Sequence, residues 1–193
     1  MAGDARQTER LLLRQPTADD RSLYHSHFIQ PEVERWLRPP PLPPFNPGAV
    51  DELVEGDQAH WSDHGFGPWV LIEKETGAFA GRGGLHWTTV EDSAAIELAW
   101  SIEPFRHNRG YATEMATAAI ERARELRIEK LIALVLPANV PSRRVAEKVG
   151  CERNGEVDHA GLPHLLYELR LIDRTRGASS PVRSAPCRGP SAS

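Results

Sequence analysis

Apolar and polar positions alternate with a period of two in several short stretches of the chain, which predicts strands. Such stretches lie at residues 11–14, 67–73 and 79–90, and a turn at 75–77 joins the last two. A continuous apolar run at 131–136 predicts another strand that is covered on both faces. Together with the helices expected between them, these strands indicate an α/β fold with a mixed sheet.

The strand expected at residues 96–102 has the most informative alternation. One face presents large apolar side chains, and the other presents a carboxylate beside two small side chains. The first face holds Ile96, Leu98, Trp100 and Ile102, and the second holds Glu97, Ala99 and Ser101. The second face therefore leaves space for a ligand.

Two early helices are predicted by their end signals. Residues 17–20, Thr-Ala-Asp-Asp, form an acidic variant of the capping box and should open a helix that runs toward Ile29. Asn46 and Pro47 supply an N-cap and a first-turn proline for a second helix, which should end near Gly65. The proline-rich segment 39–44 between them lacks most of its N–H donors, so we expect a stiff extended loop.

A third helix is predicted after Gly110, where small and apolar side chains recur at helical spacing. These side chains are Ala112, Met115, Ala116, Ala119, Ile120 and Ala123. An alanine-rich face lets a helix lie close to a sheet. The strands at 96–102 and 131–136 on either side should then form a right-handed βαβ unit with parallel strands.

The junction between the strand at 96–102 and this helix has the features of an anion site. A helix N-terminus offers unpaired backbone N–H groups and a partial positive charge. Arg106 and Arg109 flank the junction, and Gly110 has no Cβ to obstruct a ligand. We expect a phosphate here, at the carboxyl end of a strand, where open α/β sheets bind ligands.

Composition narrows the class of protein. The chain has 193 residues, 40% of them hydrophobic, and a net charge of -4, which fits one soluble domain and argues against a general nucleic-acid binder. No secretory signal or membrane-spanning segment is expected, which indicates a cytoplasmic protein. We expect residues 1–8 to be flexible, 9–173 to form the domain, and 174–193 to be a disordered tail rich in Pro, Ser and Arg.

Two segments resemble motifs of the GCN5-related N-acetyltransferases (GNAT), and within them the RimJ/RimL-like, ribosomal-protein-alanine type. They are residues 109–114, Arg-Gly-Tyr-Ala-Thr-Glu, and residues 139–150, which include Asn-Val-Pro-Ser-Arg-Arg. The resemblance extends from about residue 10 to 173. It implies the GNAT fold, a central twisted and mostly antiparallel sheet with one splayed parallel strand pair and helices on both faces. It also implies acetyl-CoA as acyl donor and an amine as acceptor.

The resemblance assigns residues to the cofactor. The family's loop follows Q/R-x-x-G-x-G/A, which places His107, Gly110 and Ala112 at its defined positions, and backbone amides of the loop hold the pyrophosphate. His107 departs from the pattern, and Arg106 beside it can supply the charge. The implied cofactor-binding residues are Trp100, Ser101, Ile102, Arg106, His107, Asn108, Arg109, Gly110, Tyr111, Ala112, Thr113, Asn139, Ser142 and Arg143. Arg143 and Arg144 are expected to meet the 3′-phosphate.

Acetyl transfer needs a neutral amine, a polarised carbonyl and a protonated leaving thiol. Glu97 is the candidate base, directly or through a water, and the alternative is a structural glutamate that pairs with a nearby arginine. A backbone N–H near Ile102 would polarise the carbonyl. By resemblance, Ser142 interacts with the leaving thiolate, because Ala146 replaces the tyrosine of other branches. Water is the alternative to Ser142.

The implied acceptor site lies between the first two helices and the late strands. It would include Trp36, His86, Trp87, the proline loop and the hairpin at 159–164. The absence of an acidic cluster favours a peptide N-terminus or a small amine over a polycation. The sequence leaves both a monomer and a homodimer open.

Two further patterns have ordinary explanations. His60 and His64 have metal-ligand spacing on a helix, but the glutamate of a zincin motif is absent, so we expect a solvated helix face and no metal. The run Gly81-Arg-Gly-Gly84 lacks the Lys-Ser/Thr of a P-loop, which favours a β-bulge or close strand packing.

A second functional hypothesis remains. His107 and the missing tyrosine would also fit a non-catalytic acyl-CoA-binding regulatory module on the same fold. A dinucleotide-binding oxidoreductase is disfavoured, because no G-x-G-x-x-G follows an early strand.

Overall fold

The computed structural model describes residues 5–171, and the expected tail at 174–193 lies outside this range. The strands in it are β1 (Arg6–Gln7), β2 (Leu11–Arg14), β3 (Pro68–Glu73), β4 (Phe79–Val90), β5 (Ser93–Ile102), β6 (Lys130–Val135), β7 (Glu152–His159) and β8 (Leu162–Arg170). The helices are α1 (Arg21–Phe28), α2 (Pro31–Leu37), α3 (Pro47–His64), α4 (Tyr111–Glu125) and α5 (Val140–Lys148), with short 3₁₀ helices η1 (Ala18–Asp20) and η2 (Pro104–Arg106).

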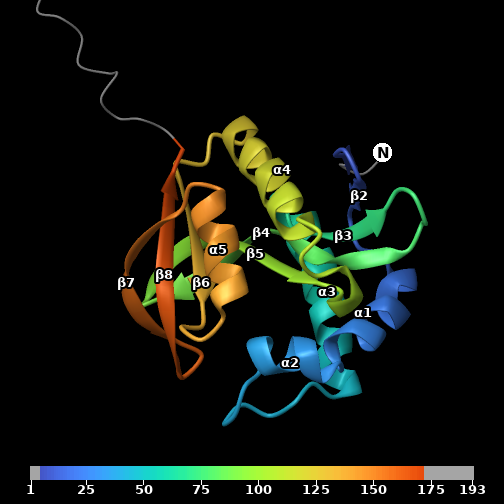
Figure 1. The fold of residues 1–193 in the computed structure, drawn as a ribbon, viewed down its shortest axis with the longest axis horizontal. Helices are drawn as coiled ribbons and strands as arrows, with labels where there is room; N and C mark the ends of the chain where they lie inside the picture. Colours follow the sequence, from blue (N-terminus) through green and yellow to red (C-terminus); the bar gives the residue numbers. More distant parts are fainter. Residues whose placement is uncertain (1–4, 172–193) are drawn as a thin grey trace, which may run out of the picture.

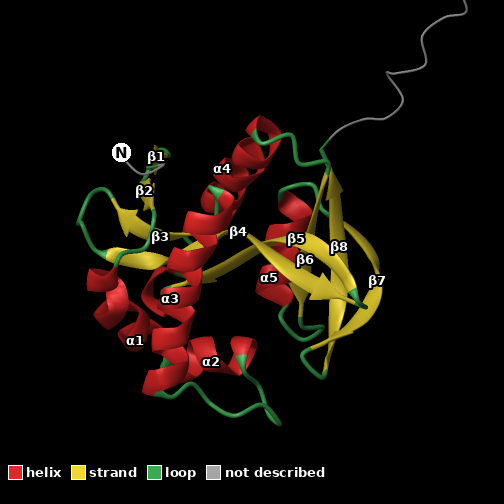
Figure 2. Ribbon diagram, turned by 180° about the vertical axis from the view of Figure 1, so that it is seen from behind, coloured by secondary structure: helices red, strands yellow, loops and turns green. Residues whose placement is uncertain are grey.

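The strands form one mixed sheet in the order β1-β2-β3-β4-β5-β6-β8-β7 (Figures 1 and 2). Neighbouring strands are antiparallel except β5 and β6, which α4 connects and which run parallel. Their described register consists of one pair, Glu97 with Ile132, so the rest of β5 up to Ile102 has no partner on that side. The mixed sheet with a single, splayed parallel pair confirms the predicted fold class.

Helices cover both faces of this sheet, as alternate residues of β3 demonstrate. Trp69 and Leu71 belong to the main core with Met115 of α4. Val70, between them, packs with Tyr24 of α1 and other apolar residues of α1 to α3 on the opposite face. A third cluster joins α5 to β6 and β8. The expected layers are therefore present.

The end signals identified α3 correctly and α1 only in part. The Asn46 side chain accepts a hydrogen bond from the Ala49 N–H at 3.0 Å, and α3 ends at Gly65, which has a φ of 68°. At residues 17–20 the Thr17 N–H donates to Asp20 Oδ2 at 2.7 Å, as in a capping box. This segment first forms η1, and the α-helix begins only at Arg21, which corrects the predicted start.

Further elements differ from the prediction, and two of them bear on the site. Helix α2 was not predicted, although Pro31 at its first position and acidic residues in its first turn are start signals. Strand β5 begins three residues earlier than expected, at Ser93.

The glycines of β4 permit close packing, as predicted. A Cβ on Gly81 would lie 2.3 Å from the carbonyl oxygen of Ser101, so β5 can lie this close to β4 only because this position has no side chain. The register of β3 against β4 also shifts between Leu71 and Ile72, next to Gly81. These contacts confirm the structural explanation of the glycine run.

A buried ion pair ties α3 to β4. Asp57 is 5% exposed, and it accepts hydrogen bonds from Arg82 at 2.5 and 2.6 Å and from the Tyr24 hydroxyl at 2.9 Å. Removal of one partner leaves an uncompensated buried charge.

We therefore expect Asp57→Ala to lower the free energy of unfolding by about 3–5 kcal/mol. Urea denaturation followed by circular dichroism measures this loss. Asp63→Ala, an exposed position on the same helix, is the matched control and should cost little. Equal effects of the two substitutions would contradict the role assigned to Asp57.

Candidate active site

The junction between β5 and α4 is a loop shaped by residues in the left-handed region. Asn108 has a φ of 60° and Gly110 a φ of 82°, and Gly110 is the N-cap of α4. Successive N–H groups in such a turn converge, and those of the first turn of α4 have no acceptor within the helix. The loop can therefore receive an anion through its backbone.

A buried carboxylate from β3 holds this loop in place. Glu73 is 3% exposed and accepts hydrogen bonds from the hydroxyls of Tyr111 and Thr76. Arg106 donates to it at 3.0 Å, and an ion pair with Arg109 spans 3.5 Å. The hydrogen bonds from Thr76 and Tyr111, together with Arg106, lower the pKa of Glu73 to about 2. Glu73 is therefore ionised at neutral pH.

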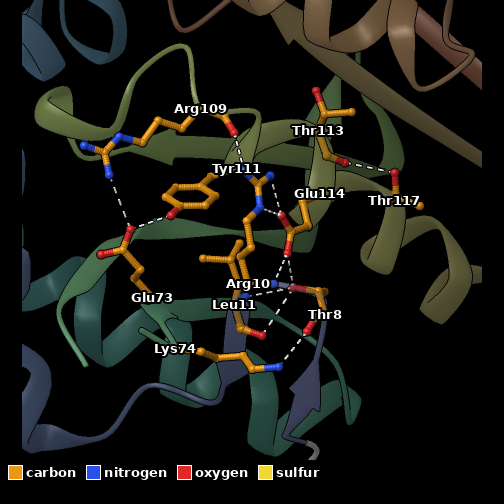
Figure 3. Close-up of polar contacts among 10 residues, drawn as sticks. All are labelled: Thr8, Arg10, Leu11, Glu73, Lys74, Arg109, Tyr111, Thr113, Glu114 and Thr117. Atoms are coloured by element: carbon orange, nitrogen blue, oxygen red, sulfur yellow. Dashed lines mark hydrogen bonds and ion pairs between the residues drawn. The ribbon is translucent and has the colours of Figure 1, made fainter. Parts of the chain in front are cut away.

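A second network supports the loop from the side of β2, as Figure 3 shows. Arg10 donates from Nη1 to the Arg109 carbonyl at 2.7 Å and from Nε to Glu114 at 2.7 Å. Its guanidinium carbon also lies 4.7 Å from the centre of the Tyr111 ring. Glu114 in turn accepts from the Thr8 hydroxyl. The backbone of the anion site is thus fixed on both sides before a ligand binds.

His107, the residue that departs from the family pattern, turns back toward the strand. Its Nε2 lies 2.9 Å from the carbonyl oxygen of Ile102. The imidazole therefore fixes the loop to the end of β5 through this contact. The anion site then relies on backbone amides, because Arg106 and Arg109 are engaged with Glu73 as well.

A cavity of about 580 Å³ runs from this loop along β5 and between β5, β6, α2 and α5. It brings together most of the residues that the sequence singled out. They are Trp36, Glu97, Trp100, Ser101, Ile102, Arg106, His107, Asn108, Gly110, Tyr111, Ala112, Thr113, Asn139 and Ser142. Arg109, Arg143, His86 and Trp87 do not line it, whereas Arg144 does.

Glu97 lies where β5 and β6 begin to separate. Its side chain is 12% exposed, and Oε2 lies 3.3 Å from Nε2 of His86. Burial raises the pKa of Glu97, but the contact with His86 and a backbone hydrogen bond from Leu134 outweigh it, so the pKa falls below its usual range. The partner of Glu97 is thus His86, and not the arginine that the alternative interpretation supposed.

The turn after β6 presents its polar groups differently from the expectation. Asn139 is the N-cap of α5, and its Oδ1 accepts the Ser142 N–H at 3.2 Å. Ser142 itself lines the cavity. Arg143 donates to the Pro137 carbonyl at 3.4 Å, outside the cavity. Of the two adjacent arginines, Arg144 is therefore the one that faces the cavity.

The histidines of α3 have a structural explanation. His60 Nδ1 lies 2.7 Å from the Phe66 carbonyl, and its Nε2 accepts the Trp87 N–H at 2.9 Å. Both ring nitrogens are thus occupied, and His60 is half-buried, so the predicted solvated face was wrong for this residue. Among residues 5–171, no group of three or more His, Cys, Asp or Glu side chains could hold a metal ion. Trp87 lies outside the cavity, 44% exposed.

The cavity also has lining residues on α2, on α5 and in the hairpin that was expected at 159–164. Helix α2 contributes Glu32, Val33, Arg35 and Leu37 beside Trp36. Lys148 of α5 lines it as well, and His159 and His164 face it from the β7–β8 hairpin, with ring centres 5.6 Å apart. The start signal at Pro31 could have revealed α2 and hence this wall.

The role of Glu73 in holding the anion loop can be tested through protein stability, without an activity assay. Glutamate has an unshifted pKa of 4.5, so the lowered pKa stabilises the folded state above pH 4.5, and this contribution is lost as the pH falls toward about 2. We expect the difference in unfolding free energy between wild type and Glu73→Gln to shrink over this window, as measured by urea denaturation at a series of pH values. Glu75→Gln, exposed in the same turn, should show no such change. A difference that stays constant with pH would contradict the assignment.

Comparison with known proteins identifies the family. The sequence profile of the acetyltransferase (GNAT) domain matches residues 10–152. The uncharacterized protein YkkB of Bacillus subtilis (strain 168) is 30% identical over 120 residues, 62% of this chain and 70% of its own. An acetyltransferase structure from Agrobacterium tumefaciens str. C58 matches with a TM-score of 0.75 and 25% identity, over 88% of this chain and 96% of that chain. Mycobacterium smegmatis RimJ, solved with CoA-disulfide, shares the fold with a TM-score of 0.65 and 22% identity, over 88% and 85% of the two chains.

The chain therefore belongs to the GNAT family and is an acetyltransferase that acts on amines, as the motifs at 109–114 and 139–150 predicted.

Proposed function

We propose that the protein transfers the acetyl group of acetyl-CoA to a primary amine, by direct attack in a ternary complex. One observation carries this proposal: a single cavity connects the anion site at the α4 N-terminus with Glu97. The two ends of the cavity thus have the chemistry needed to hold a phosphorylated donor and to deprotonate an acceptor. RimJ was solved with a CoA derivative, which supports the same ligand class here.

The residues present fit this donor. The amides of the loop from Asn108 to Thr113 would hold the pyrophosphate, and Arg144 on the cavity wall would meet the 3′-phosphate. The unpaired edge of β5 up to Ile102 would pair with the pantetheine arm, and one of its N–H groups would polarise the carbonyl. Ser142 would protonate or hydrogen-bond the leaving thiolate. The donor supplies an activated thioester, and the protein supplies position and proton transfer.

Glu97 is the proposed base. Its lowered pKa keeps it ionised at neutral pH, and it would take the proton of the amine directly or through a water. An α-amino group has an ordinary pKa of about 7.7–8.0, so a weak base is sufficient for it. The buried Cys151 thiol has a pKa raised to about 11 by burial, which makes it a poor competing nucleophile.

The acceptor would be a peptide N-terminus or a small amine. Arg35 and Glu32 from α2, with Trp36, form a wall that carries both charges and an aromatic surface. Such a wall suits an amine that carries its own carbonyl or carboxylate groups better than a polycation. No helix within residues 5–171 is long and apolar enough to cross a bilayer, and a cytoplasmic location remains part of this proposal.

The anion site can be tested by placing a negative charge in it. We expect Gly110→Glu to weaken acetyl-CoA binding by at least about tenfold, because a carboxylate would repel the pyrophosphate. Isothermal titration calorimetry measures the affinity, and thermal denaturation confirms folding. Gly56→Glu, at an α3 position where a Cβ would meet nothing within 4 Å, is the matched control. Unchanged affinity in folded Gly110→Glu would remove the site assignment.

The base can be tested by a neutral replacement. We expect Glu97→Gln to lower kcat about a hundredfold or more, with KM for acetyl-CoA close to that of wild type. Since the pKa of Glu97 is lowered, the wild-type rate should rise with pH as the acceptor amine loses its proton. Release of free thiol across a panel of amines measures both quantities. Glu91→Gln in the exposed β4–β5 turn is the control, and equal rates in the two variants would exclude Glu97 as the base.

A further inference from the structure

A second polar cluster lies beside the cavity, and the reaction described above gives its side chains no part in proton transfer. His27 of α1 is 1% exposed, and its Nε2 lies 2.8 Å from Oγ of Ser101. Its Nδ1 lies 2.7 Å from Oε2 of Glu103. Gln30 donates to the other carboxylate oxygen of Glu103 at 2.8 Å. The three side chains thus form a Ser-His-carboxylate series.

The direction of each hydrogen bond in this series follows from its chemistry. Burial raises the pKa of Glu103, but hydrogen bonds from His27 and Gln30 outweigh it, so the pKa is lowered and Glu103 is an ionised acceptor. In the neutral imidazole, His27 Nδ1 then carries the hydrogen toward Glu103, which leaves Nε2 as the acceptor of the Ser101 O–H. The edges of Phe28 and Phe79, with ring centres 5.0 and 5.4 Å away, fix the plane of the imidazole.

A serine that only anchors a buried histidine has no access to a ligand. Ser101, by contrast, also lines the cavity. It is half-buried and lies on the same strand face as Glu97. It belongs to the part of β5 that has no β6 partner, so the backbone N–H groups on that edge of the same strand make no ladder hydrogen bonds to β6. Nucleophile, base, orienting carboxylate and N–H donors are the parts that acyl transfer through serine requires.

We infer that Ser101 is a nucleophile that, with His27 as its base and Glu103 as the positioning residue, hydrolyses the acyl-CoA thioester when no amine is bound. This inference rests on the proposed acetyl-CoA site. Ser101 Oγ forms a bond to the thioester carbonyl carbon and gives its proton to His27 Nε2. The C–S bond breaks, and the CoA thiolate takes that proton. Water then attacks the carbonyl carbon of the serine ester and gives a proton to His27 Nε2. His27 passes this proton to Ser101 Oγ as the ester bond breaks, and acetate leaves.

The first experiment follows thiol release from acetyl-CoA in the absence of any amine. We expect Ser101→Ala and His27→Gln to lower this release at least tenfold, and Ser26→Ala to match wild type. Ser26 is the matched control, because it adjoins His27 and its hydroxyl donates to the Ser22 carbonyl on the exposed side of α1. Calorimetry on Ser101→Ala measures acetyl-CoA affinity, so that lost hydrolysis can be traced to the hydroxyl. Equal release by Ser101→Ala and Ser26→Ala would overturn the inference.

The second experiment detects the nucleophile itself. A fluorophosphonate probe should label Ser101 in wild type, as located by peptide mass spectrometry, and acetyl-CoA should protect it. Glu103→Gln should slow the labelling, and Glu103→Asp should restore part of the rate, which a purely structural carboxylate would not do. Rapidly quenched protein should also carry one acetyl group on the peptide with Ser101.

The two proposals fail in different ways. If folded protein does not bind acetyl-CoA, the proposed function falls, and the labelling of Ser101 still decides whether the serine is activated. If acetyl-CoA binds and amines are acetylated but Ser101 is neither labelled nor acylated, the cluster only joins α1 to β5, and the hydrolysis inference is overturned.

Discussion

The separation of β5 from β6 is the constraint on which the site depends. A parallel pair needs a crossover element, and α4 provides it. Because the described register between the two strands is a single pair, the backbone groups of β5 beyond Glu97 need partners other than β6. A ligand or water can supply them only if the space beside the strand stays open. The cavity is therefore a consequence of the sheet, and α4 begins at its end because the crossover starts there.

Buried carboxylates fix the elements around this opening. Glu73 joins β3 to the anion loop, Glu103 joins the end of β5 to α1, and Asp57 joins α3 to β4. Ion pairs on the surface contribute little to stability, but each of these carboxylates has several donors and is largely excluded from solvent. Glu73 also reduces the positive charge of the anion loop, because it forms ion pairs with Arg106 and Arg109. Recognition of an anion then depends mainly on backbone amides, so the loop can still bind an anion although His107 departs from the family pattern.

Local signals predicted the elements that have strong end residues or a clear period. Asn46, Pro47 and Gly65 bound α3 as expected. The alternation of β5 placed Glu97, Ala99 and Ser101 on one face, but Leu98, Trp100 and Ile102 of the other face line the cavity as well, because the opening follows the strand edge. Helix α2 was missed because it has seven residues and buries only Val33, so it shows little periodicity.

The partner of Glu97 could not be predicted either. His86 meets it only through the antiparallel register of β4 and β5, which no local pattern specifies. The cluster of Ser101, His27 and Glu103 likewise joins residues more than 70 positions apart.

The strand geometry of β5 also bears on how Glu97 acts. Glu97 and Ser101 share a face but are four residues apart, which corresponds to about 13 Å along an extended strand. A thioester within bonding distance of Ser101 therefore lies beyond direct reach of the Glu97 carboxylate, which His86 and the Leu134 N–H hold near the start of the opening. If Ser101 is acylated by acetyl-CoA, Glu97 must deprotonate the amine through water. A thioester bound closer to Ala99 would instead put the amine within direct reach of Glu97 and beyond reach of Ser101, so direct proton transfer and an acylated Ser101 exclude each other on this strand.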